Sequence, residues 1–165
     1  MSEYVVVVAD GSRARFFTLE PAEIPEVEGG PNLVEREDLA NPELEAHDRD
    51  LWSEAKTGRN RAPNGGPAHG YDDHRTQHEA EFERRFARRV AERAAELARA
   101  NGTRRVVVAA EKRMLGFLRN ESGALQKAGL EVREVARDLS KLVPRQIHEH
   151  LAREGALPRR RSPAA

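Results

Sequence analysis

The chain has 165 residues and carries 28 basic and 28 acidic side chains, so its formal charge is zero. It contains no cysteine, which excludes a disulfide framework, a thiolate metal site and a cysteine nucleophile. No apolar run approaches the ~20 residues that a membrane span requires, and residues 1–10 carry no basic segment ahead of an apolar core. We therefore expect a single-domain cytoplasmic protein that does not contact membranes.

The zero charge hides an asymmetry between two parts of the chain. Residues 1–54 hold 14 acidic and 4 basic side chains, whereas residues 55–165 hold 14 acidic and 24 basic ones. A chain that is neutral overall can therefore present a strongly basic surface to nucleic acid. If the acidic segment folds beside the arginines it screens them, and if it lies apart the molecule is a dipole.

The first forty residues predict three strands, over residues 4–9, 13–19 and 32–39. The first strand is an unbroken run of mostly β-branched side chains, typical of a strand that is buried on both faces. Asp10-Gly11 tolerates positive φ, so we expect a tight hairpin between the first two strands. Residues 21–31 carry three prolines and predict a loop before the exposed third strand.

A long helix is predicted after an extended connection. Residues 40–75 show little periodicity, and we expect them to form a long flexible loop. Thr76-Gln77-His78-Glu79 has the form of a capping box and predicts the start of the helix. One apolar stripe follows at helical spacing, formed by Phe82, Phe86, Val90, Ala94 and Leu97. We expect this stripe to face a sheet, so that Phe82→Asp unfolds the domain.

The rest of the chain predicts two strands and two helical regions. They are a strand over residues 104–110, a helical region over 111–127 with a break near Ser122-Gly123, a strand around 130–135 and a helix beginning at Pro144. Residues 158–165 are predicted to be a disordered basic tail. The domain is therefore expected to span residues 1–157.

This order of elements restricts the topology. Three consecutive strands form a meander, and the two later strands need right-handed helical crossovers to lie parallel to the first. The most economical arrangement is an α/β fold with a mixed five-stranded sheet in the order 3-2-1-4-5. Helices would cover both faces of the sheet, as in ribonuclease-H-like proteins.

Such a sheet suggests carboxylates that bind two Mg²⁺ ions. Asp10, Glu111 and Asp138 each follow a predicted strand, so one hypothesis is a metal-dependent nuclease. The alternative is a turn residue, a helix cap and a loop residue, and the inner strands carry no acid of their own. We therefore expect no catalytic residues, no metal and no cofactor, and we interpret His148 and His150 as solvated surface side chains.

Arginines around the long helix suggest contacts with RNA phosphates. Arg84 and Arg88 project away from the apolar stripe, and Arg59 and Arg61 lie in the preceding loop beside Gly65 and Gly66. These six residues are the predicted nucleic-acid-binding site. The alternative is an ordinary charged helix face, because Glu81, Glu83, Glu92 and Glu96 alternate with the arginines and can pair with them.

Five short motifs carry a resemblance to a known family. They are DGSRARFF at residues 10–17, LANP at 39–42, LGFLR at 115–119, RDLS at 137–140 and IHEHL at 147–151. In this order they resemble the bacterial host attachment proteins. The chain departs from that family at Glu111-Lys112, where prolines are frequent, and at Ser140, where threonine is usual.

The family in turn resembles the ribonuclease-H-like middle domain of archaeal and eukaryotic release factors. There a Gly-Gly-Gln loop precedes the long helix and enters the peptidyl-transferase centre. Here Gly65-Gly66-Pro67 takes that place, and proline lacks the backbone N–H through which the glutamine acts. The resemblance therefore implies a non-catalytic protein that binds the ribosome or structured RNA.

Two alternatives remain beside that interpretation. One is the metal-dependent nuclease, and the other is a protein-interaction module in which the acidic segment 20–54 contacts a protein partner. The family name implies a role in attachment to host cells. An intracellular effect on attachment is compatible with the sequence, whereas a direct adhesin role is not expected.

Overall fold

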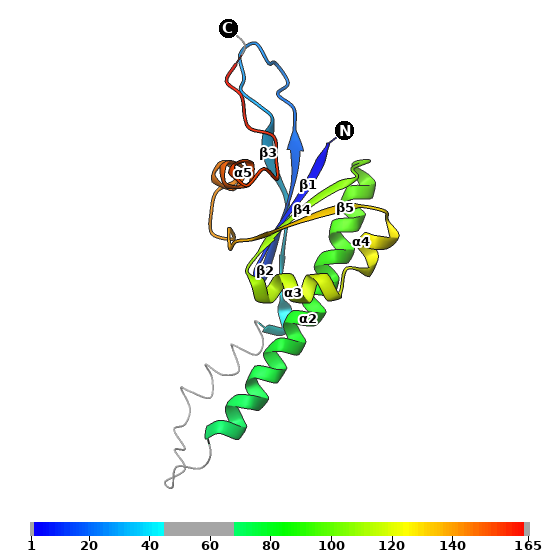
Figure 1. The fold of residues 1–165 in the computed structure, drawn as a ribbon, viewed down its shortest axis with the longest axis vertical. Coiled ribbons are helices and arrows are strands. Elements are labelled where there is room, and N and C mark those ends of the chain that lie inside the picture. The colour runs from blue at the N-terminus through cyan, green and yellow to red at the C-terminus, as the bar shows by residue number, and fades with distance from the viewer. Residues whose placement is uncertain (1, 45–67, 164–165) are drawn as a thin grey trace.

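The computed structural model describes residues 2–44 and 68–163, without the side chains of residues 68–76. Five strands form one mixed sheet in the order β3-β2-β1-β4-β5 (Figure 1). The strands are β1 (Tyr4–Ala9), β2 (Arg13–Glu20), β3 (Asn32–Ala40), β4 (Arg105–Ala110) and β5 (Glu131–Ala136), and the helices are α2 (Ala68–Ala100), α3 (Lys112–Asn120), α4 (Gly123–Lys127) and α5 (Pro144–Arg153). The predicted strand order and α/β class are confirmed.

The hairpin between β1 and β2 is closed by an aspartate side chain. Asp10 Oδ1 accepts hydrogen bonds from the backbone N–H groups of Ser12 and Arg13, both at 2.8 Å. The expected positive φ at this turn is wrong, because among the described residues only Gly102, Gly129 and Gly155 have it. Gly11 lies close to the Glu83 side chain instead: a Cβ at position 11 would lie 2.9 Å from the carboxyl carbon of Glu83, so that side chain would have to shift.

The central parallel strands β1 and β4 are covered by helices on both faces, whereas the edge strand β5 is mostly exposed. Figure 1 shows α2, α3 and α4 on one side of the sheet and α5 on the other. Alternation along β1 divides the core, because Val5 and Val7 pack toward α2 whereas Val6 and Val8 pack toward α5. Central strands buried on both faces explain the unbroken runs of valine in β1 and β4.

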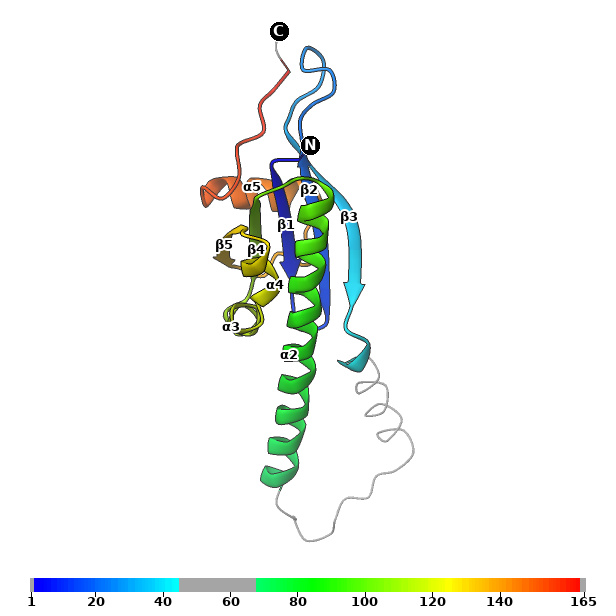
Figure 2. The ribbon, with the colours of Figure 1, turned by 90° about the vertical axis from the view of Figure 1, so that its right-hand side faces the viewer.

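Helix α2 is longer than the sequence predicts. It begins at Ala68 rather than at Thr76, so the last part of the predicted loop 40–75 is helical, while residues 45–67 lie outside the described residues. At 1.5 Å per residue, its 33 residues span about 50 Å. Figure 2 shows its N-terminal part extending past the end of the sheet.

The apolar stripe of α2 packs on the sheet only from its middle onward. Phe86 and Val90 are each 1% exposed, whereas Phe82 is only half-buried. The position one turn before Ala87 on the buried side is occupied by Glu83. The expected stripe is confirmed for Phe86, Val90, Ala94 and Leu97. Phe82 lies at its less buried end, and unfolding by Phe82→Asp stays a prediction.

The α5 face of the sheet also holds the C-terminal segment. Ile147 and Leu151 of α5 pack against Val6, Val8 and Phe17. His148 is 2% exposed and its Nε2 donates to the carbonyl oxygen of Pro158 at 2.8 Å, so the prediction of a solvated histidine is wrong.

Residues 158–163 do not match the predicted disordered tail. The backbone N–H of Gly30 donates to the oxygen of Arg161 at 3.0 Å, and the N–H of Arg161 donates to the oxygen of Gly30 at 2.8 Å. Arg160 Nε also donates to Asn32 Oδ1 at 2.8 Å. The segment is therefore held against the loop between β2 and β3 by hydrogen bonds between residues that lie 128 to 131 positions apart in the sequence.

Candidate functional site

The three carboxylates of the nuclease hypothesis have separate surroundings. Asp10 is engaged in the β1–β2 turn, and Asp138 Oδ1 accepts from the N–H of Ser140 at 3.1 Å and from its hydroxyl at 2.6 Å. Glu111 stands at the N-cap of α3 without a side-chain cap bond. Among the described side chains, those of residues 2–44 and 77–163, no three acidic or histidine side chains are placed to hold a metal ion. The structure therefore does not bring this trio together as a two-metal site.

Glu83 is a largely buried acidic side chain at the carboxyl ends of β1 and β4. Its side chain is only 13% exposed, packs against Gly11, and pairs with Arg113 Nε at 3.2 Å. Burial raises the pKa of the Glu83 carboxyl, the Arg113 charge opposes this shift, and the charges of Glu111, Glu79 and Asp10 add to it. We did not predict this residue, although the spacing 83, 87, 90, 94 places it on the buried stripe.

The arginines of α2 divide into two groups. Arg85 pairs with Glu43 at 3.0 Å, and Arg93 pairs with Glu37 of β3, so this side of the helix faces the acidic segment. Other acids of that segment pair with strand arginines, in the pairs Arg13–Asp38, Arg15–Glu35 and Arg36–Glu20. The described part of the acidic segment therefore screens Arg85 and Arg93 of α2, whereas its other pairs lie within the first 54 residues.

The second group comprises the predicted site residues Arg84 and Arg88. Their side chains are 50% and 70% exposed, and each pairs with a glutamate of the same helix: Arg84 with Glu81 at 2.8 Å, and Arg88 with Glu92 at 3.4 Å. The pairing anticipated for an ordinary charged helix face is therefore present. Exposed pairs of this kind contribute only about 0.3–0.5 kcal/mol, so they yield readily to a better partner.

Arg84 also belongs to a cluster that the sequence did not reveal. Its guanidinium carbon lies 5.9 Å from the centre of the Phe117 ring, and that of Arg113 lies 5.8 Å from the same centre. Phe117 is half-buried on α3. We call Arg84, Arg88, Arg113 and Phe117 the α2–α3 arginine surface, which combines cations that can bind phosphate with an aromatic ring on which a base can stack.

The other four predicted binding residues cannot be placed. Arg59, Arg61, Gly65 and Gly66 lie outside the described residues, so their part of the nucleic-acid site stays a prediction.

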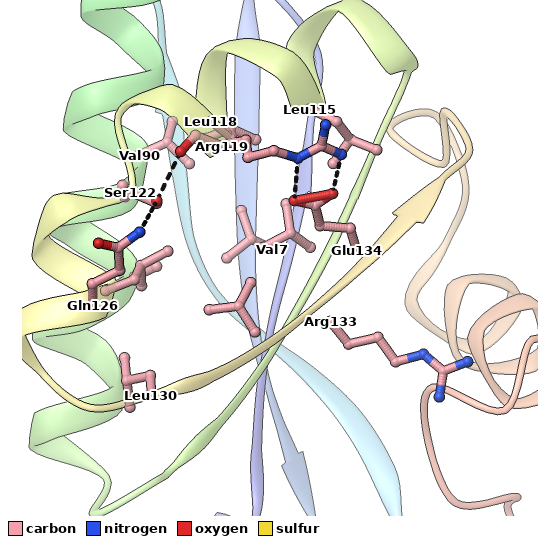
Figure 3. Close-up of a pocket in the computed structure, with 15 residues that line it drawn as sticks. Val7, Val90, Leu115, Leu118, Arg119, Ser122, Gln126, Leu130, Arg133 and Glu134 are labelled. Atoms are coloured by element: carbon pink, nitrogen blue, oxygen red, sulfur yellow. Dashed lines mark hydrogen bonds and ion pairs between the residues drawn. The ribbon is translucent and has the colours of Figure 1, made fainter.

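An apolar pocket of about 580 Å³ lies between α2, α3, α4 and the edge strand β5 (Figure 3). Its walls include Val7, Val90 and Leu118. An ion pair between Arg119 and Glu134, with a closest approach of 2.5 Å, lies at its edge. The pocket can accept an apolar group, and its charged lining residues Arg119 and Glu134 already neutralise each other.

The chain resembles a known protein family over most of its length. A protein-family model described as "Protein required for attachment to host cells" matches residues 5–151, from β1 almost to the end of α5. The chain belongs to this family. None of the curated proteins matches the chain. In the part of the chain that the structure describes, no helix of this host-attachment family protein is long and apolar enough to cross a membrane.

The motifs that carry the resemblance hold this host-attachment family protein together. Arg15 of the first motif donates from NH1 to the backbone oxygens of Ser140 at 3.0 Å and Leu142 at 2.6 Å. Asn41 of the second is 2% exposed and donates to the oxygens of Gly11 at 3.2 Å and Phe82 at 3.3 Å. These motif residues connect distant segments, which accounts for them without a catalytic role.

Proposed function

We propose that this host-attachment family protein is a non-catalytic cytoplasmic protein that binds structured RNA, such as that of the ribosome, through the α2–α3 arginine surface. The observation that carries the proposal is the convergence of Arg84 and Arg113, from two helices, on the ring of Phe117. Arginines beside a partly exposed aromatic ring can combine phosphate contacts with base stacking.

The ion pairs on this surface do not prevent RNA binding. A guanidinium can form two parallel hydrogen bonds with a phosphate, which are stronger than a single exposed contact with a glutamate. Arg84 and Arg88 each have an exposed partner on their own helix, so a phosphate can replace that partner without breaking the core. Release of the counterions condensed on RNA then favours binding.

The shape of α2 also supports the proposal. Its N-terminal part extends past the sheet (Figure 2), which allows the helix to reach a recessed part of a large assembly. The resemblance to the middle domain of release factors implies the same geometry of approach. Pro67 in place of the glutamine removes the N–H on which hydrolysis depends, so the protein would bind without hydrolysing peptidyl-tRNA.

The test compares two double variants that remove the same charge. Arg84→Gln/Arg88→Gln should weaken binding to a fluorescent RNA stem-loop about tenfold and lower the salt slope by about 1.4 to 1.8, because two phosphate contacts are lost. Arg99→Gln/Arg104→Gln, two exposed arginines that form no ion pair with a described residue, should leave the affinity nearly unchanged. Phe117→Leu keeps an apolar side chain on α3 and should also weaken binding.

Equal losses in the two double variants would mean that the RNA responds only to net charge, and would contradict the assignment of this surface. Sedimentation with ribosomes that persists unchanged in Arg84→Gln/Arg88→Gln would contradict it as well.

A second candidate keeps the acidic segment as a protein-binding surface. The loop between β2 and β3 exposes Ile24 and Val27, with exposed fractions of 50% and 68%, among exposed glutamates. Such apolar side chains suit a basic protein partner with an apolar centre. Ile24→Ser/Val27→Ser should then abolish binding to a protein partner whose capture survives nuclease treatment. The same variant should leave RNA binding intact.

A further inference from the structure

We propose that α5 and the C-terminal segment form a binding site for a phosphate-bearing small molecule. A pocket of about 380 Å³ lies between them, and four arginines line it: Arg145, Arg153, Arg159 and Arg160. We call it the α5–tail pocket. It goes beyond the proposed RNA-binding function, because it lies on the α5 side of the sheet, whereas α2 and α3 cover the opposite face (Figure 1).

The pocket depends on the docking of residues 158–163. The paired backbone hydrogen bonds between Gly30 and Arg161 fix one end of this segment. The hydrogen bond from His148 to the oxygen of Pro158 fixes the other end directly on α5. Arg159 lies between these two anchors, so its backbone is held beside α5 rather than free in solution.

The charge of the pocket is not neutralised by the protein. Arg145, Arg153 and Arg159 form no ion pair with any residue that the structure describes, in contrast to Arg84 and Arg88. Arg160 bonds only to uncharged groups, Asn32 Oδ1 at 2.8 Å and the oxygen of Gly29 at 3.3 Å. Arg145, Arg153 and Arg159 therefore retain their attraction for an anion, and Arg160 keeps its charge while its guanidinium is held at the loop between β2 and β3.

The remaining lining residues limit what the pocket can bind. Glu149 is the single acid of the lining, and it leaves a net positive charge against the four arginines. His148 uses Nε2 on the carbonyl of Pro158, so it positions the segment rather than contacting the ligand. Several guanidinium groups around a concave space suit a phosphate or diphosphate group, which accepts paired hydrogen bonds from each.

The phosphate could belong to a small metabolite or to RNA, and we favour the small molecule. The volume of this pocket matches a phosphorylated molecule of nucleotide size or less, since ligand pockets measure roughly 300–1,000 Å³. RNA duplexes are instead bound along extended surfaces rather than in small pockets, and their phosphates stay exposed to solvent.

Titration calorimetry with inorganic pyrophosphate tests the site. The full chain should bind pyrophosphate, and Arg145→Gln/Arg159→Gln should bind it at least tenfold more weakly. The matched control Arg99→Gln/Arg104→Gln removes two exposed arginines elsewhere that form no ion pair with a described residue, and it should bind pyrophosphate as the parent does. Failure of the parent to bind, or an equal loss in the control, would overturn the proposal.

Two further measurements separate this site from the RNA surface. Arg84→Gln/Arg88→Gln should bind pyrophosphate normally, and pyrophosphate should slow hydrogen exchange at the Arg161 amide, which donates to Gly30. If Arg145→Gln/Arg159→Gln weakens RNA stem-loop binding while the parent does not bind pyrophosphate, the pocket binds RNA phosphates. The assignment of a small ligand is then wrong. Loss of RNA binding in the α2 variant alone leaves the pocket proposal unaffected.

Discussion

Both faces of the sheet have an apolar core, but hydrogen bonds from arginines to backbone carbonyls are added on the α5 face. The α2 face is filled by apolar side chains from α2, α3 and α4, including many alanines that let α2 lie close to the strands. The α5 face is covered by one ten-residue helix, and cationic side chains complete the attachment. Arg15 donates to the carbonyls of Ser140 and Leu142, and Arg133 NH1 and NH2 donate to those of Gly155 and Glu154, both at 2.8 Å.

The difference teaches which substitutions each face tolerates. Apolar packing depends on volume and has little directionality, so the α2 face should respond mainly to changes in side-chain size. Hydrogen bonds to backbone carbonyls depend on direction and number, so the α5 face should respond to substitutions that keep size but remove donors. Three variants test this contrast.

The largest effect is expected on the α2 face. Phe86→Ala removes a ring that is 1% exposed and should lower the free energy of unfolding by about 3–5 kcal/mol, because it leaves a cavity under α2. Phe82→Ala is the matched control, since the same change at a half-buried position should cost clearly less. Urea unfolding followed by circular dichroism measures both, and equal losses would contradict the position of the buried stripe.

An intermediate effect is expected on the α5 face. Arg15→Gln removes the charged donor to two carbonyls and the pair with Glu35. Because the glutamine amide can still donate to one carbonyl, the variant should lose the equivalent of one charged hydrogen bond, about 1.5–3 kcal/mol. Arg13→Gln on the same strand loses only an exposed pair with Asp38 and should cost much less. If Arg15→Met, which keeps the length of the side chain but no donor, is as stable as the parent in urea, the contrast between the faces fails.

The smallest effect concerns Glu83, the one acid on the buried stripe of α2. Because its pKa is raised by burial, the folded state binds the Glu83 proton more readily than the unfolded state does. This proton stabilises the fold at low pH, and that contribution is lost as pH rises from about 4.5 through the raised pKa. Glutamine does not titrate, so the stability of Glu83→Gln relative to the parent should increase from pH 4 to pH 7.

Urea unfolding at several pH values measures this difference. Glu81→Gln, an exposed acid on the same helix, serves as the control and should not show the same trend. A stability difference that is independent of pH would show that Arg113 compensates fully for the burial of the carboxylate.

Much of the fold could be predicted because its signals are local. Unbroken runs of valine identified β1 and β4, and handedness rules then left one economical strand order. The start of α2 could not be predicted, because Thr76-Gln77-His78-Glu79 has the form of a cap although the helix already begins at Ala68. A capping sequence is compatible with a helix start but does not prevent a helix from continuing through it.

The candidate site was only partly predictable. Exposed arginines at Arg84 and Arg88 follow from helical periodicity, but their neighbours on α3 depend on how two helices pack. The cluster around Phe117 therefore leaves no pattern in either helix alone. The docking of Arg161 on Gly30 is likewise invisible, since arginines and prolines near a chain end look like a solvated tail.

The bridge between Gly30 and Arg161 has a consequence for the order of events in synthesis. The meander of β1, β2 and β3 is made first, whereas Arg161 follows Gly30 by 131 residues. The two hydrogen bonds between Gly30 and Arg161 therefore form only after β4, β5 and α5 have been made. The α5–tail pocket is completed at this step, so occupancy by an anion would report that residues 158–161 have docked beside α5.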